Sequence, residues 1–200
     1  MTYTYVRALS GAVIDFANPD PGQIRLSDII FNLSNITRFQ GGMYLPWSVA
    51  SHSLMVAGLA HQDGQPMEVQ RWALMHDFHE AYTGDIPSPL KRYVEGDVDG
   101  LGGQTILSDL EEKLDEVICV ALGVPRPGPV VRAIVDRFDK EAYQMEVEMF
   151  RSPVDTSLLV SWQAGASPAC IMDMYANRVP LMWADAKRHN LNQAHGAGNV

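Results

Sequence analysis

The sequence predicts an all-α fold, a single helical bundle with a short β-hairpin at its N-terminus. The chain has 200 residues and 46% of them are hydrophobic, which suffices for one domain with a sizeable core but not for two ordinary domains. Apolar residues recur with helical spacing over most of residues 26–149. We therefore expect one domain over residues 1–200, with its core at about 8–150, further helices at 151–190 and a disordered tail at 193–200.

The N-terminal residues 3–16 are rich in β-branched and aromatic side chains, and Ser10-Gly11 lies near the middle of this stretch. This pattern predicts two short strands joined by a turn. The spacing of apolar residues becomes helical after Ser27, which is a good N-cap, and the first helix is expected to end near Asn35.

Two central helices are expected to carry histidines. Ser48 is placed to cap a helix whose apolar face includes His52. Pro66 opens the next helix, which carries His76 on one side and is closed by Gly84. Because consecutive helices with a short connection are antiparallel neighbours, the two histidines are expected to lie on adjacent helices.

Later segments alternate between loops and helices. Residues 95–103 contain four glycines and three acidic residues, and they predict a mobile loop that could serve as a lid. An amphipathic helix at 107–121 is ended by Gly123, a long helix starts at Pro129, and a weaker helix is expected at 179–189. The predicted core stripe of the long helix comprises Val131, Ile134, Val135, Phe138, Ala142, Met145 and Met149.

Composition limits the possible partners. The net charge of −9 and the pI near 5.0 argue against binding to nucleic acid polymers or to an anionic membrane surface, whereas a small phosphorylated substrate remains compatible with a few local cations. The sequence has neither a transmembrane pattern nor a secretory leader, so a cytoplasmic protein is expected. Cys119 and Cys170 lack a C-x-x-C partner and fit reduced, buried cysteines.

Metal-ligating and proton-transferring side chains are concentrated in residues 76–91, H-D-F-H-E-A-Y-T-G-D-I-P-S-P-L-K. His76 and Asp77 stand near the end of a predicted helix, and His52 lies on an apolar stripe that offers it no obvious polar partner. Together with Asp139 from the long helix, these residues would form a mixed nitrogen and oxygen site. Such a donor set suits a divalent ion of Mn, Fe, Co, Ni or Zn.

The order of these residues resembles that of the HD-domain phosphohydrolases, which have a His, a later His-Asp pair and a final Asp on separate helices. The resemblance covers about residues 8–150 and is closest to the small 5'-deoxynucleotidases and the phage dATP triphosphohydrolases. It lies in N-I-T-R-F at 35–39, W-S-V-A-S-H-S-L-M-V-A at 47–57, D-K-E-A at 139–142 and the segment 76–91. The resemblance implies an HD-domain bundle with one divalent transition metal, and Mg on the substrate phosphates is also possible.

The same resemblance implies hydrolysis of the 5' phosphoester of a (deoxy)nucleotide. The leading expectation is a dATP triphosphohydrolase that releases a deoxynucleoside and triphosphate. The alternatives are a 5'-deoxynucleotidase acting on monophosphates and a catalytically silent scaffold that binds nucleotides. Members of this family are commonly homo-oligomeric, and a phage-encoded member would act in the host cytoplasm.

The catalytic roles implied by the resemblance fall on two acidic residues. Glu80, one helical turn beyond His76, would be the general acid/base. Asp85 would act with Glu80 or hold a sugar hydroxyl. For the last metal ligand, Asp136 and Asp139 are both available, and we favour Asp139 because it matches the family motif.

Four residues are candidates for substrate contact. Arg38 matches an arginine that contacts substrate phosphate, and Lys91, expected in a rigid proline-rich turn, is a second phosphate candidate. Phe39 stands where the bacterial deoxynucleotidases suggest a Trp that packs on the sugar. His79 is expected at the polar rim of the site, in contact with substrate, with a third imidazole near the metal as the alternative. A zinc peptidase is disfavoured, because the H-E-x-x-H pattern would require His at Thr83.

Overall fold

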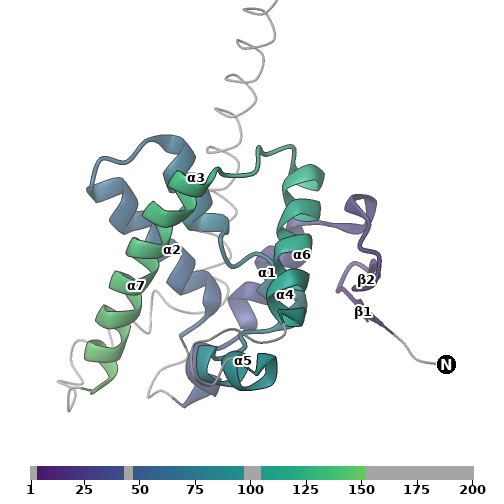
Figure 1. Cartoon of the computed structure of the whole chain (residues 1–200), viewed down its shortest axis with the longest axis horizontal. Helices are drawn as coiled ribbons and strands as arrows, with labels where there is room; N and C mark the ends of the chain where they lie inside the picture. Colours follow the sequence, from purple (N-terminus) through teal and green to yellow (C-terminus); the bar gives the residue numbers. More distant parts are fainter. Residues whose placement is uncertain (1–3, 43–46, 97–104, 152–200) are drawn as a thin grey trace, which may run out of the picture.

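The structure is a computed structural model that describes residues 4–42, 47–96 and 105–151, with side chains to residue 148 (Figure 1). The segments expected at 151–190 and 193–200, including the weaker helix, lie almost entirely outside the described residues. In the described part, no helix is long and apolar enough to cross a bilayer. The elements are β1 Tyr5–Arg7, β2 Val13–Asp15, η1 Pro21–Gln23, α1 Leu26–Asn35, η2 Arg38–Gly41, α2 Val49–Gln62, α3 Met67–Met75, α4 Glu80–Thr83, α5 Ser88–Glu95, α6 Ile106–Leu122 and α7 Pro129–Arg151.

The predicted N-terminal hairpin is confirmed. Strands β1 and β2 pair antiparallel, with Tyr5 opposite Asp15, and Gly11 in the turn has a left-handed φ of 87°. Ser10 joins the hairpin to α1, because its backbone N–H and its hydroxyl both donate to the carboxylate of Asp28 at 3.0 and 2.6 Å.

The predicted start of the first helix was wrong by two residues. Helix α1 begins at Leu26, and its N-cap is Arg25, which makes no side-chain capping hydrogen bond. Ser27 therefore lies inside the helix rather than at its cap. The predicted end at Asn35 is confirmed.

The core forms where α2, α3 and α7 pack against one another, with α1 against α2 and α4 (Figure 1). Burying a large apolar side chain completely contributes about 1.5 to 3 kcal/mol, so these contacts hold the helices that carry the candidate site firmly in place. Fully or almost fully buried members of this core include Ile29, Leu33, Val49, Val56, Leu74, Met75, Phe78, Leu114, Ile118, Val135, Phe138 and Ala142.

The helix predicted from Pro66 to Gly84 is divided into two. Helix α3 ends at Met75 and α4 begins at Glu80. Between them the backbone forms tight i to i+3 hydrogen bonds, from Phe78 N–H to the carbonyl of Met75 at 2.9 Å and from Glu80 N–H to that of Asp77 at 3.0 Å. The fully buried side chain of Phe78 anchors this turn.

The rigid turn predicted around Lys91 was also wrong, because these residues form helix α5. Pro89 is in the first turn of α5, where a missing N–H is tolerated, and Gly96 ends the helix with a left-handed φ of 73°. Helix α5 packs against α6 but buries none of its own residues. Of the loop expected at residues 95–103, residues 97–103 lie outside the described residues, whereas Glu95 is the last residue of α5 and Gly96 is its C-cap.

Helices α6 and α7 appear where the sequence predicts them, and Pro129 is the first residue of α7. The predicted core stripe of α7 is wrong near its end: Met145 is exposed, whereas Glu146 is fully buried. The reason is that the buried positions continue in a four-residue step from Ala142 to residue 146. The side chain of Met149 lies outside the described residues.

Candidate functional site

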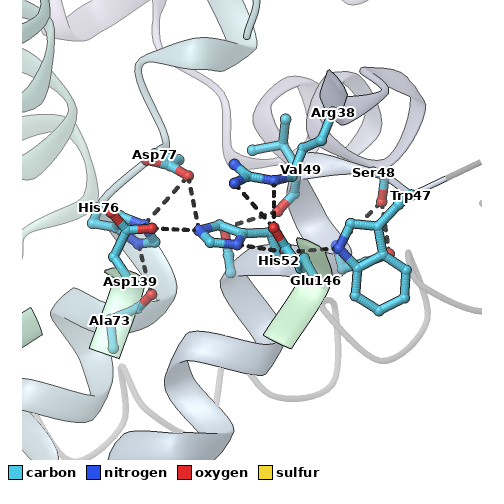
Figure 2. Close-up of polar contacts among 12 residues, drawn as sticks. Arg38, Trp47, Ser48, Val49, His52, Ala73, His76, Asp77, Asp139 and Glu146 are labelled. Carbon is cyan, nitrogen blue, oxygen red and sulfur yellow. Dashed lines mark hydrogen bonds and ion pairs between the residues drawn. The ribbon is translucent and has the colours of Figure 1, made fainter. Parts of the chain in front are cut away.

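The structure brings three of the predicted metal ligands together (Figure 2). His52 comes from α2, and His76 and Asp77 come from the turn after α3. One ligand atom from each lies within 4.8 Å of the others. A carboxylate oxygen of Asp77 is 3.7 Å from His52 Nε2 and 3.3 Å from His76 Nε2. This cluster could hold a metal ion.

Asp139 completes the predicted set from α7. Its Oδ1 atom is 2.9 Å from His52 Nε2 and 3.9 Å from His76 Nε2 (Figure 2). Asp136, the alternative one turn earlier, is exposed on the outer face of α7. The position of each residue on the helix therefore favours Asp139 over Asp136 as the last ligand, a choice that the sequence alone left open.

The orientation of both histidines fits a metal site. His52 Nδ1 is 2.7 Å from a carboxylate oxygen of Glu146, and His76 Nδ1 is 2.8 Å from the carbonyl of Ala73, which can only accept. The Nε2 atoms are thereby directed at the cluster. They are buried and are assigned no hydrogen bond with the described residues, and Asp139 Oδ1 lies 2.9 Å from His52 Nε2 as an ion-pair contact. Two oriented imidazoles beside two carboxylates suit a divalent metal.

Glu146 is a candidate functional residue that the sequence pattern did not single out. Its side chain is fully buried, and it accepts from Trp47 Nε1 at 2.7 Å and from Arg38 Nε at 3.2 Å, in addition to its contact with His52 (Figure 2). A signal was present, because Glu146 stands seven residues after Asp139 and so shares its helix face. The neighbouring Met145 is apolar, and it was therefore assigned to the core stripe of α7 in place of Glu146.

The cluster is strongly polarised in the metal-free protein. Burial disfavours the charged form of His52, but Asp139 and then Glu146 outweigh burial and raise its pKa to about 9. Burial likewise opposes ionisation of Asp139, yet the histidines lower its pKa to about 2. The pKa of Asp77 is lowered against burial by His76 and then His52. A proton on His52 thus occupies the position that a metal cation would take.

A cavity of about 610 Å³ opens beside the cluster. Among the residues that line it are six that the sequence analysis singled out for metal binding, catalysis or substrate contact. These six are Arg38, Phe39, Asp77, Glu80, Asp85 and Asp139.

Glu80 lies next to the cluster and lines the cavity. Its side chain is largely buried, and its Oε2 atom makes no hydrogen bond with the described residues. Burial, followed by the charges of Asp77 and Asp85, raises the pKa of Glu80 well above its usual value. Burial also raises the pKa of Asp85, although Arg38 opposes this shift. Two acids next to the cluster therefore hold a proton more strongly than exposed carboxyl groups do.

Arg38 and Phe39 lie on a strained segment at one side of the cavity. Phe39 and Gln40 are consecutive non-glycine residues with left-handed φ values of 55° and 54°. The ring of Phe39 stacks on that of Tyr143, with centroids 5.9 Å apart, and the guanidinium carbon of Arg38 is 5.5 Å from the Phe39 ring. The backbone N–H of Arg38 donates to the carbonyl of Trp47 at 2.8 Å, which fixes the segment.

The structure does not bring His79 or Lys91 to the cavity. His79 Nδ1 is 3.0 Å from a carboxylate oxygen of Asp115 on α6, and this carboxylate raises the pKa of His79 although burial lowers it. Lys91 forms an ion pair with Glu111, also on α6. Because α5 is helical, the next residue, Arg92, is the one that lines the cavity.

Arg92 and Lys140 share an unusual property. Both are exposed, both line the cavity, and neither has a hydrogen bond, ion pair or ring contact with the described residues. The other arginine and lysine side chains that the structure describes all have a polar or electrostatic partner. Two unpartnered cations thus flank a cavity that is otherwise rich in carboxylates.

Fold and site together define a mainly helical protein with a candidate His and Asp metal-binding cluster beside an acid-lined cavity. No family model matches the chain. The chain is 33% identical over 142 residues to the uncharacterized protein RCAP_rcc00048 of Rhodobacter capsulatus, covering 67% of each sequence, and it belongs to the same family as that protein. It is also 34% identical over 122 residues to the uncharacterized protein YfdR of Escherichia coli K12, which is 61% of this chain, and it spans about 60% of the length of YfdR.

Proposed function

We propose that this protein is a metal-dependent nucleotide phosphohydrolase of the HD-domain type, which cleaves the bond between phosphorus and the 5'-oxygen. One observation carries the proposal. Two buried histidine Nε2 atoms without hydrogen bonds face two carboxylates beside a cavity. The resemblance to HD-domain phosphohydrolases is the second support.

His52, His76, Asp77 and Asp139 would hold one divalent transition metal, with Co, Mn, Zn, Ni and Fe as the candidates. When bound, such an ion polarises a phosphoryl oxygen and lowers the pKa of a water molecule. The donor set supports this assignment, because neutral imidazoles and carboxylates are ligands for these metals.

Arg38 and Glu80 would carry the chemistry of the chain itself. The guanidinium of Arg38 lines the cavity, where it would bind and orient a phosphoryl oxygen. As the oxygen of water bonds to phosphorus and the bond to the 5'-oxygen breaks, Glu80 Oε2 would deliver its proton to that leaving oxygen. A proton of the water then restores Glu80. Asp85 would share this proton transfer or hold a sugar hydroxyl.

The aromatic pair of Phe39 and Tyr143 would bind the nucleoside. Both rings line the cavity and stack on one another, which gives an apolar wall beside the reacting groups. A sugar packed against Phe39 would stand between this wall and the carboxylates. Selection of deoxyribose over ribose would then depend on how closely Phe39 approaches the 2' position.

Arg92 and Lys140 favour a substrate with more than one phosphate. Each presents an unpartnered positive charge to the cavity, whereas Arg38 is available for the phosphate that reacts. A triphosphohydrolase is therefore the leading form of the proposal, and the resemblance to the phage enzymes makes dATP its expected substrate, with deoxyadenosine and triphosphate as products. A 5'-deoxynucleotidase acting on monophosphates is the alternative.

A panel of nucleotides tests the proposal. Deoxy- and ribonucleotides with one, two or three phosphates are incubated with Co, Mn, Mg or Zn, and the products are separated. Inorganic triphosphate is the expected product, and orthophosphate from monophosphates would select the nucleotidase instead. Comparing adenine with 2-aminoadenine nucleotides tests the phage-type role. No product with any metal would leave only a silent scaffold.

A further inference from the structure

We infer that Glu146 is a positioning residue that joins the metal-binding histidine to the anion-binding arginine, so that both halves of the site depend on one buried carboxylate. The inference rests on the proposed function for the roles of His52 and Arg38. It does not follow from the ligand pattern, because Glu146 neither belongs to the ligand cluster nor lines the cavity.

The two oxygens of Glu146 have separate partners. Oε1 lies 2.7 Å from both His52 Nδ1 and Trp47 Nε1, whereas Oε2 lies 3.2 and 3.1 Å from Nε and Nη2 of Arg38. A fully buried carboxylate is costly unless its oxygens are satisfied, and here each oxygen lies within 3.2 Å of two nitrogens. The carboxylate thus spans the distance between α2, which carries His52, and the segment that carries Arg38.

Oε1 determines which nitrogen of His52 faces the cluster. With Nδ1–H donating to Glu146, only Nε2 is available as a ligand atom, and the ring cannot rotate without losing this contact. Residues that hold a metal-binding histidine in this way typically contribute 10- to 100-fold to metal affinity.

Oε2 fixes the direction of Arg38. It binds one edge of the guanidinium, made of Nε and Nη2, while the same side chain lines the cavity. Burial would lower the pKa of Arg38, but the surrounding carboxylates, Glu146 first and then Asp77, Asp85 and Glu80, together raise it. Glu146 therefore orients the guanidinium for an anion that Glu146 itself does not touch.

The variant Glu146→Gln should remove the contact that orients Arg38 while keeping the contact that orients His52. The amide has one acceptor, and the Trp47 indole can only donate, so the Gln oxygen is expected to face Trp47 and His52 while its NH₂ group faces Arg38. Affinity for tripolyphosphate should then fall about tenfold or more, and metal affinity should fall less. Glu146→Ala should weaken both by roughly 10-fold or more. Glu148→Gln, on the exposed face of the same helix, is the matched control and should change neither.

A double-mutant cycle tests whether Glu146 acts through Arg38. If it does, Glu146→Gln combined with Arg38→Ala should bind tripolyphosphate no more weakly than Arg38→Ala alone. Additive losses would overturn the link to the arginine. Wild-type metal and anion affinities in both Glu146 variants would overturn the inference as a whole, even in a protein that hydrolyses nucleotides.

A measurement on the unaltered protein covers variants that fail to fold. In metal-free wild-type protein labelled with ¹⁵N, the Nδ1–H of His52 and the indole N–H of Trp47 should resist exchange with solvent. Rapid exchange of both would overturn the inference. Protected protons, with the expected split of affinities in Glu146→Gln, would support it even if the nucleotide panel gave no product and the proposed function failed.

Discussion

The two sides of the cavity are built differently. On the inner side, His52, His76 and Asp139 come from helices or helix ends that bury a continuous apolar core. On the outer side, α5 buries no residue at all and contributes Arg92 to the cavity. The candidate metal centre therefore rests on the most constrained part of the described fold, whereas the proposed substrate contacts lie partly on α5, which buries no residue.

The largest expected effect is on the inner side, from Asp77→Ala. Removing a carboxylate that lies within 3.7 Å of both histidine Nε2 atoms should reduce metal affinity more than about 100-fold, beyond the loss typical of an outer partner, and turnover should disappear with it. Metal analysis and nucleotide hydrolysis of the purified variant check this. Asp63→Ala, which removes an exposed carboxylate paired with Arg137, is the control. An Asp77→Ala protein that keeps its metal would show that the inner side of the cavity does not hold the metal as proposed.

Glu80→Ala should separate chemistry from metal binding. Glu80 lines the cavity but is not in the ligand cluster, so the variant should keep its metal while the rate falls by about 10² to 10⁴. Metal content and kcat of the same preparation provide the test. Full activity in this variant would remove the proposed proton transfer.

Metal affinity should depend on pH through the inner side. The pKa of His52 is raised to about 9 in the metal-free protein, so a metal at Nε2 must displace a proton below that pH. Apparent affinity should therefore rise by about tenfold for each pH unit as pH increases toward 9, and it should level off above that value. Chelator competition at several pH values measures the slope. A flat profile between pH 6.5 and 8.5 would contradict the assigned role of His52.

A smaller effect is expected on the outer side, from Arg92→Ala. Loss of an exposed charge at the cavity should raise KM for a triphosphate by a few-fold, because exposed charge pairs contribute up to about 1 kcal/mol, and leave KM for a monophosphate unchanged. Lys140→Ala should act in the same way. Steady-state kinetics with dATP and dAMP test both variants. Equal effects on the two substrates would show that these cations do not distinguish phosphate number.

The smallest effect is expected at the neighbouring Lys91. Its ion pair with Glu111 is partly exposed, so Lys91→Ala should lower stability by less than about 1 kcal/mol and change KM less than twofold. Thermal unfolding and steady-state kinetics of Lys91→Ala test this prediction. Arg92→Ala is the matched variant, because it removes the neighbouring cation on the same helix. A large rise in KM for Lys91→Ala, without one for Arg92→Ala, would support the predicted phosphate role of Lys91. It would contradict the assignment of Arg92 as the cation of α5 that acts at the cavity.

Helical periodicity and a distinctive residue pattern explain why the inner side was predictable. His52 lies on a regular apolar stripe, so its inward direction follows from spacing, and the His76-Asp77 pair stands at a helix end. Asp139 follows from its place beside the stripe of α7. The structure brings all four of these donors together, as the sequence analysis expected.

The features that were not predicted depend on tertiary contacts, and the periodicity of apolar residues carries no information about such contacts. Glu146 was missed because an apolar Met145 was assigned to the core, and only the partners on other elements make a buried charge acceptable there. Lys91 was misplaced because two prolines suggested a turn, although a proline in the first turn is compatible with a helix. The break between α3 and α4 depends on the burial of Phe78.

The left-handed backbone at Phe39 and Gln40 has a cost for the whole fold. Each such residue destabilises the native chain by about 1 to 2 kcal/mol, and the segment persists because Arg38 and its neighbours are tied down on both sides. A glycine in place of Gln40 would relieve this backbone strain and should raise the melting temperature of the protein. The ring of Phe39 would then be held less firmly, so under the proposed function the same change that raises thermal stability should weaken discrimination between deoxyribose and ribose.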